Sequence, residues 1–215
     1  MKIFLVSLAM WSVPLGMAQP SLQGVYQSVS SSTTLPGGLR NSGSPAAVEL
    51  LPEAARQAKT VNLKKDPWKQ CQPVGPFRMM AAEQAKIELV QVDRMIVMLF
   101  EDLSHGMMRN IYLKRGHLAK LEPTWLGDSV GHWEGTTLVV DSTGFNDRTW
   151  LNEEGAQHSD ALHLVERIRP VLDGKYLEVR MTAEDPKALR KPYSYTRYFQ
   201  KVDAEITDDV CQDEN

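Results

Sequence analysis

The chain has 215 residues, of which 42% are hydrophobic and 24% are charged, and its formal net charge is −3. This hydrophobic content with a low net charge is typical of a globular protein and excludes disorder for most of the chain. The slightly acidic charge balance argues against a nucleic-acid partner, which would require a basic surface. The length fits a single domain.

The first eighteen residues have the pattern of a secretory signal peptide. Lys2 provides a positive start, residues 3–17 are mostly apolar, and Gly16 and Ala18 are the small residues expected before a cleavage site. The apolar run is shorter than the ~20 residues that span a bilayer. We therefore predict cleavage after Ala18 and an exported protein, periplasmic or secreted, without a membrane span. The oligomeric state stays open.

Cys71 and Cys211 are the two cysteines of the chain. An even number of cysteines in an exported protein favours a disulfide, and the alternative is two unpaired thiols. A bridge between them would close a loop of about 140 residues, which the chain-entropy model values at up to ~5 kcal/mol. We therefore predict a Cys71–Cys211 disulfide.

The segment before residue 86 contains few strand signals. Residues 29–46 are rich in Ser, Gly and Pro, which predicts a loop or linker. Residues 51–60 predict a short helix, because Pro52 and Glu53 suit a first helical turn. We expect residues 19–48 to form an N-terminal strand and a linker, and residues 49–215 to form the main domain.

Apolar runs separated by short turns dominate the chain from residue 86 onward. Runs of this kind bounded by Asp and Gly predict β-strands. The expected strands are residues 24–28, 86–92, 95–101, 107–113, 128–134, 136–142, 162–169, 176–183 and 193–200. Eight or nine short strands with little helix predict an all-β, antiparallel β-barrel-like fold. A barrel of this size can hold one small ligand.

Three motifs resemble those of a family of exported bacterial proteins, mostly hypothetical, that are frequent in soil bacteria. The motifs are GDSVGHWEGTTLVVD at residues 127–141, GFNDRTWL at residues 144–151 and HSDALH followed by Glu-Arg at residues 158–167. The resemblance implies a shared fold and a shared site, but no reaction. His132 and Thr136 depart from the usual Arg and Asp. Separately, residues 24–26 are similar to the Gly-x-Trp start of lipocalin-like barrels, which implies a calycin or lipocalin-like fold.

The densest polar cluster contains His158, Asp160 and His163. A histidine beside a carboxylate is the usual unit of acid–base catalysis near neutral pH. His163 and Arg167 share one face of their predicted strand, while Glu166 lies on the other. In the catalytic hypothesis the two histidines exchange protons, Asp160 orients one of them and Arg167 holds a substrate oxygen. In the structural alternative, Asp160 caps a turn and His163 bonds to the backbone.

A second cluster combines tryptophans with carboxylates and an amide. Such side chains suit a pocket that stacks a ring and bonds to its edge. The alternative is that they serve as core, turn and cap residues. The candidate substrate-binding residues are Trp133, Glu134, Asp141, Asn146 and Trp150, together with Arg167.

These patterns favour an exported enzyme with an interior pocket. We expect cofactor-independent acid–base chemistry of the lyase, isomerase or hydrolase type on a ring-containing organic substrate. The alternative is a non-catalytic, lipocalin-like carrier of a small ligand. A third possibility is a metal-dependent hydrolase with His158, Asp160 and His163 as ligands, although no metal site is predicted because a fourth ligand cannot be assigned.

Overall fold

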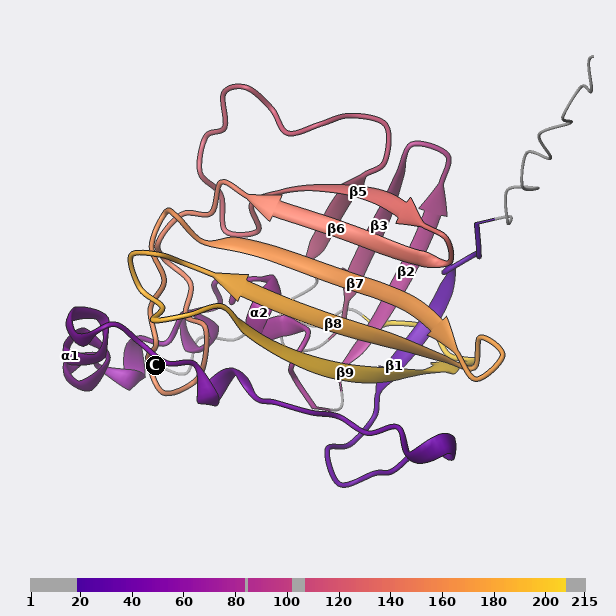
Figure 1. The fold of residues 1–215 in the computed structure, drawn as a ribbon, viewed down its shortest axis with the longest axis horizontal. Coiled ribbons are helices and arrows are strands. Elements are labelled where there is room, and N and C mark those ends of the chain that lie inside the picture. The colour runs from indigo at the N-terminus through magenta and orange to yellow at the C-terminus, as the bar shows by residue number, and fades with distance from the viewer. Residues whose placement is uncertain (1–18, 84, 102–106, 208–215) are drawn as a thin grey trace, which may run out of the picture.

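The computed structural model describes residues 19–83, 85–101 and 107–207 and shows a closed barrel of nine strands (Figure 1). This confirms the predicted all-β barrel and each of its predicted strands, whose ends shift by two residues or fewer. The strands are β1 (Gly24–Ser28), β2 (Lys86–Val92), β3 (Met95–Phe100), β4 (Met108–Tyr112), β5 (Asp128–Glu134), β6 (Thr137–Thr143), β7 (His163–Val171), β8 (Tyr176–Glu184) and β9 (Tyr193–Val202).

Strands that follow one another along the chain are neighbours in the barrel, and most pairs are antiparallel. The exception is β4 with β5, which pair in parallel through Ile111 with Ser129 and Tyr112 with Val130. A parallel pair needs a long crossover rather than a tight turn, and residues 113–127 provide it. The sequence patterns did not predict this exception, because they carry no information on strand direction.

The barrel closes through β1, which pairs with β2 on one side and β9 on the other. The barrel therefore includes residues from before position 49, where the sequence placed the start of the main domain. Residues 29–85 are an excursion between two neighbouring strands, and the predicted Ser-, Gly- and Pro-rich linker, residues 29–46, is its first part.

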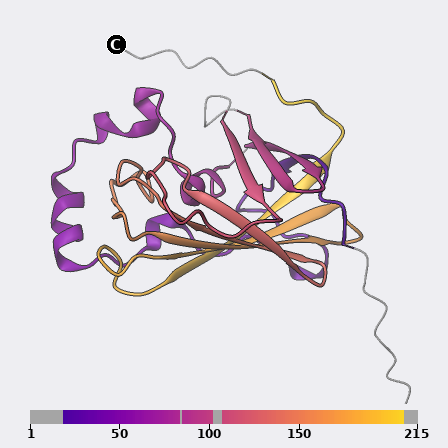
Figure 2. The ribbon, with the colours of Figure 1, turned by 90° about the horizontal axis from the view of Figure 1, so that it is seen from above.

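The excursion carries the helices. The predicted helix is present as α1 (Pro52–Thr60), and it lies beside the barrel end that also carries the β6–β7 connection (Figure 1 and Figure 2). A short α2 (Pro76–Met79) was not predicted, although its proline occupies the first turn, where a missing N–H costs nothing. The remaining turns are 3-10 helices, η1 (Pro36–Gly38), η2 (Pro45–Ala47), η3 (Leu63–Lys65) and η4 (Pro67–Gln70). Among the described residues, no helix has the length and apolar content to cross a bilayer.

The inward side chains fill the barrel interior. On β8, Leu177, Val179 and Met181 are 0–1% exposed. If an empty space large enough for a ligand lay beside these side chains, they would count as exposed rather than buried. α2 adds the Phe77 ring, which meets Tyr195 edge-on with a centroid distance of 5.0 Å. The interior is therefore a packed core, and the predicted interior pocket is not where open space lies.

The predicted leader and disulfide fall at the ends of the chain. Residues 1–18 and Cys211 lie outside the described residues, so cleavage after Ala18 and the bridge to Cys71 stay predictions.

Candidate functional site

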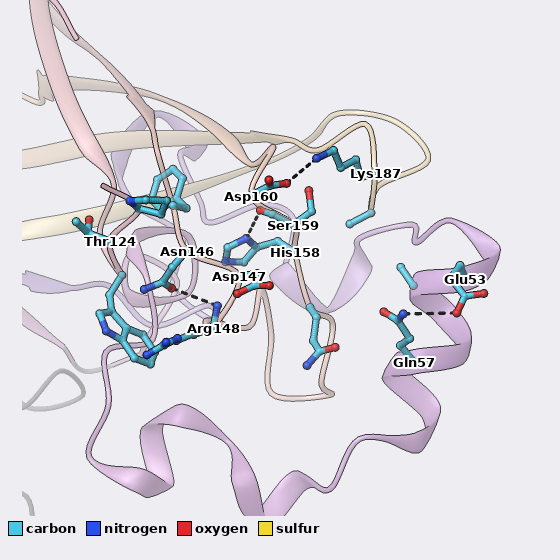
Figure 3. Close-up of a pocket in the computed structure, with 16 residues that line it drawn as sticks. Glu53, Gln57, Thr124, Asn146, Asp147, Arg148, His158, Ser159, Asp160 and Lys187 are labelled. Carbon is cyan, nitrogen blue, oxygen red and sulfur yellow. Dashed lines mark hydrogen bonds and ion pairs between the residues drawn. The ribbon is translucent and has the colours of Figure 1, made fainter. Parts of the chain in front are cut away.

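An open cleft with a volume of about 1010 Å³ lies at one end of the barrel (Figure 3). Its walls come from α1, the β4–β5 crossover, the β6–β7 connection and the segment after β8. We call it the rim cleft. Three candidate site residues line it, namely Asn146, His158 and Asp160, and it also includes Trp125, Arg148 and Lys187.

His158 is a buried lining residue of the rim cleft with an exposed fraction of 5%. Its Nδ1 lies 2.8 Å from the Ser159 carbonyl oxygen, which can only accept a hydrogen bond, so Nδ1 carries the proton. Its Nε2 then accepts a bond from the Thr149 hydroxyl at 2.5 Å. Burial lowers the pKa of His158 and outweighs the bond to Ser159, which favours the neutral ring. Both ring nitrogens are thus engaged by the protein itself.

Asp185 organises the loop that carries His158. Its carboxylate accepts bonds from the backbone N–H of Ser159 at 2.6 Å and from the Ser159 hydroxyl at 2.8 Å. It also accepts from the N–H groups of Lys187 and Ala188, which caps the turn after β8. A buried carboxylate with four such donors holds the two loops together. The sequence offered a signal in the Asp-Pro pair at residues 185–186, typical of a turn.

Asp160 bonds to Lys187 rather than to a histidine. The carboxylate accepts from Lys187 Nζ at 2.7 Å on the exposed edge of the cleft (Figure 3). Lys187 lowers the pKa of Asp160 through this hydrogen bond and its charge. His158 takes its orientation from Ser159 and Thr149 instead, so the predicted orienting role of Asp160 has no geometric basis here.

Asn146, Arg148 and Trp125 present groups that a ligand could contact. The Asn146 side-chain oxygen accepts from the Arg148 backbone N–H at 3.2 Å, which leaves its amide NH₂ without a protein partner among the described residues. The Arg148 guanidinium carbon lies 5.9 Å from the centre of the Trp125 ring. No carboxylate of the described chain forms an ion pair with Arg148. An indole face, an amide and a guanidinium therefore line the same cleft, and Figure 3 shows Asn146 and Arg148 side by side in it.

His163 lies elsewhere, on the outer wall of the barrel. Leu164, Glu166 and Ile168 are buried, so the alternate residues His163 and Arg167 face outward. The predicted catalytic group is therefore split, with His158 in the rim cleft and His163 on the wall.

Asp141 is the partner of His163 and the centre of a chain of hydrogen bonds. His163 Nε2 lies 2.8 Å from one Asp141 oxygen, and His117 Nε2 lies 2.9 Å from the other. His117 Nδ1 lies 2.9 Å from Asp128. A ring bonded to a carboxylate at each nitrogen must donate at both, so His117 is the imidazolium cation. The sequence missed His117, which stands alone in a predicted loop. We call this chain the wall relay.

The charges in the wall relay support one another. The Arg115 hydrogen bond holds the pKa of Asp128 at about 2, against the effect of burial and with help from His117. Burial lowers the pKa of His117, but its two carboxylate partners raise it by more. Burial raises the pKa of Asp141, but the bonds from His163 and His117 lower it by more. The relay ties the β4–β5 crossover to β5, β6 and β7.

The other predicted binding residues lie on the outer wall or in the core of the barrel. Arg167 donates to Glu134 at 2.7 Å on the exposed wall, and this bond lowers the pKa of Glu134. Trp150 is buried at 5% exposure, and Trp133 packs partly buried against the core. These residues and Asp141 are not part of the rim-cleft lining. Trp133 and Trp150 pack in or against the core, as in the structural alternative, whereas Glu134, Asp141 and Arg167 form ion pairs on the outer wall.

The barrel interior contains an ion pair that the sequence did not indicate. Arg109 on β4 pairs with Glu166 on β7, and their side chains are 2% and 0% exposed. Arg109 also donates to the hydroxyls of Ser129 at 3.0 Å and Ser142 at 2.8 Å. Strand alternation places Glu166 and His163 on opposite faces of β7, as predicted. Only the closed barrel shows that the Glu166 face is the interior.

Comparisons with known proteins find solved structures that align with this chain at low identity and low TM-score. No protein-family model and no curated protein matches this chain. The structure of a REP1-NXSQ fatty acid transporter aligns with a TM-score of 0.43 and 9% identity over 86% of this chain and 98% of that one. The zebrafish ileal bile acid-binding protein complexed with cholic acid gives 0.37 and 10% over 84% and 98%. A mutant of the fluorescent protein UnaG gives 0.35 and 12% over 56% and 73%.

Within the described residues, no three His, Cys, Asp or Glu side chains gather in a way that could hold a metal ion. The three histidine-cluster residues considered as metal ligands instead bond to Thr149, Ser159, Lys187 and Asp141.

Proposed function

We propose that this protein binds a small, ring-containing polar molecule in the rim cleft and acts as a non-catalytic carrier. The observation that carries the proposal is the grouping of Trp125, Asn146 and Arg148 in a cleft of about 1010 Å³. Clefts of roughly this size accommodate small organic ligands. Each of the three side chains has a surface or donor that the described protein leaves unused.

The lining indicates the chemistry of the ligand. Trp125 offers a flat apolar face, on which a ring can stack. Asn146 and Arg148 offer N–H donors, which match hydroxyl, carbonyl or carboxylate oxygens on the ring edge. The basic Arg148 and Lys187 are balanced by acidic side chains of the same lining, Glu53, Asp147 and Asp160. This balance favours a neutral or singly charged ring that bears several oxygen atoms.

The catalytic alternative has less support because its acid and base are occupied. Both nitrogens of His158 are bonded within the protein, and His163 pairs with Asp141 on the outer wall. A general base must reach the proton that it removes, directly or through one water. The rim cleft contains donors that can hold a ligand, but the Thr149 hydroxyl that occupies His158 Nε2 is 3% exposed and lies outside the cleft lining.

Calorimetric titration with monosaccharides and hydroxybenzoic acids tests the proposal. We expect one of these probe classes to bind, and we expect Trp125→Ala and Arg148→Ala each to weaken binding about tenfold or more, as loss of a central aromatic or arginine contact does. Met108→Ala is the control, because Met108 is exposed and lines neither the rim cleft nor the separate cleft beside Trp68. Binding that is unchanged in Trp125→Ala, or no binding by any probe, would overturn the proposal. Chemical conversion of a bound probe would support the enzyme instead.

A further inference from the structure

Arg197 on β9 is a buried cation without an ion-pair partner in the described part of the chain. Its exposed fraction is 9%. Nη1 donates to the backbone carbonyls of Ser42, Gly43 and Thr196 at 3.2, 3.0 and 3.0 Å. Nε and Nη2 form no hydrogen bond among these residues. The guanidinium carbon also lies 4.9 Å from the centre of the Tyr195 ring. Carbonyl groups and a ring face contribute partial charges only, so the guanidinium keeps a net positive charge that an anion could neutralise.

Arg197 lines a second cleft, separate from the rim cleft, with a volume of about 690 Å³. This cleft lies between the excursion of residues 29–85 and the β6–β7 connection, and we call it the excursion cleft. Val74 and Met79 are its buried apolar lining, at 4% and 3% exposure. Leu63 and Trp68 also line this cleft, and their side chains are 47% and 39% exposed.

None of the other charged residues in the described lining of the excursion cleft forms an ion pair with Arg197. They are the carboxylates Asp66, Glu83, Glu153 and Glu154 and the cations Lys69 and Arg78. Asp66 is engaged by Arg78, which donates to both of its oxygens at 2.8 and 2.9 Å. Glu83 accepts from the Ser31 backbone N–H at 3.3 Å and forms no ion pair with Arg197. The positive charge of Arg197 nevertheless lowers the pKa of Glu83. The cleft thus combines a buried unpaired guanidinium with an exposed indole and leucine.

We propose that the excursion cleft binds an organic carboxylate with an apolar ring or chain. The carboxylate accepts from Nε and Nη2 of Arg197, the edge of the guanidinium suited to a bidentate pair. The apolar body covers Trp68 and Leu63 and removes them from water. This site is independent of the proposed rim cleft, since the two linings share no residue.

A pair of probes that differ in charge tests this proposal. 2-Naphthoate and 2-naphthamide have the same ring, but only the first carries a carboxylate. We expect the native protein to bind 2-naphthoate at least about tenfold more tightly, as measured by quenching of tryptophan fluorescence. Arg197→Met should abolish that preference, whereas Arg167→Met, on the outer wall, should leave it unchanged. Equal affinity for the two probes, or a preference that survives Arg197→Met, would overturn the proposal.

Arg197→Met could disturb the fold, because Arg197 also bonds to the backbone of the excursion. A second variant therefore tests the site without changing Arg197. Trp68→Ala changes an exposed side chain, so the fold should persist, and it should weaken both probes by a similar factor. Trp125→Ala should weaken neither. If Trp125→Ala rather than Trp68→Ala reduces binding, the probe occupies the rim cleft and the proposed excursion site is wrong, with no consequence for the rim-cleft proposal.

Discussion

The interior ion pair and the wall relay are built on the same part of the barrel but lie on opposite faces of its sheet. Inside, Arg109 and Glu166 are 2% and 0% exposed. Outside, His117, Asp141 and His163 are 29%, 38% and 35% exposed. Water can solvate the outer charges if a partner is lost, whereas no water reaches the inner ones. The same kind of interaction should therefore have very different energetic consequences on the two faces.

This difference also bears on function. Arg109 donates from Nε to Ser129 on β5 and from Nη2 to Ser142 on β6, whereas its buried Nη1 has no hydrogen-bond partner among the described residues. The pair occupies part of the interior, whereas the two clefts described above are lined mainly by connecting segments. The outer relay instead fastens a connection, the β4–β5 crossover, onto the wall.

The largest effect should come from breaking the interior pair. Glu166→Gln or Arg109→Met leaves one buried charge without its partner, and we expect a loss of about 3–5 kcal/mol in the free energy of unfolding. Urea titration measures it. The double variant Arg109→Met, Glu166→Leu should lose less than either single variant because no charge remains buried. Additive losses would contradict this account of the pair.

Asp128 should have the next largest effect. Its pKa of about 2 lies below the ordinary 3.8, so its ionised form stabilises the fold at pH values above 3.8 and that stability is lost as the pH falls toward 2. The shift corresponds to about 2 kcal/mol at pH 7, which Asp128→Asn should remove. Unfolding curves at pH 7 and near pH 2 check this. The difference between native and variant should vanish at the lower pH.

His117 should give a smaller effect of opposite pH dependence. Its pKa is raised in the folded state, so its contribution is complete below pH 6.5 and is lost as the pH rises through the folded value. The midpoint of thermal unfolding of the native protein should therefore fall as the pH rises above neutrality. In His117→Gln the part of this fall that comes from His117 should be absent. A native midpoint that stays flat over the same range would show that the histidine is not charged in the relay.

The exposed pair Arg167–Glu134 should have the smallest effect. Exposed ion pairs are typically worth 0–1 kcal/mol, because water and salt screen them. Arg167→Ala should therefore change the free energy of unfolding by less than about 1 kcal/mol, and ligand binding in the rim cleft should not change. A large loss of binding would restore Arg167 to the role that the sequence suggested.

The sequence by itself determined the strands and the direction in which their side chains alternate. The apolar runs from residue 86 onward mark β2 to β9 because period-two burial leaves a local pattern. It also determined that Glu166 and His163 face opposite ways. The position of α1 followed equally from its own residues, since Pro52 and Glu53 act within one turn.

Only the tertiary structure decided which face of β7 became the interior, and hence which predicted residues could share a site. Strand alternation relates neighbours on one strand, but barrel closure and the parallel β4–β5 pair bring together Arg109, Glu166 and the two serines. The rim cleft likewise combines Trp125, Asn146 and Lys187 from three separate connections. Such contacts depend on chain closure over long sequence separations, so no local pattern of residues records them.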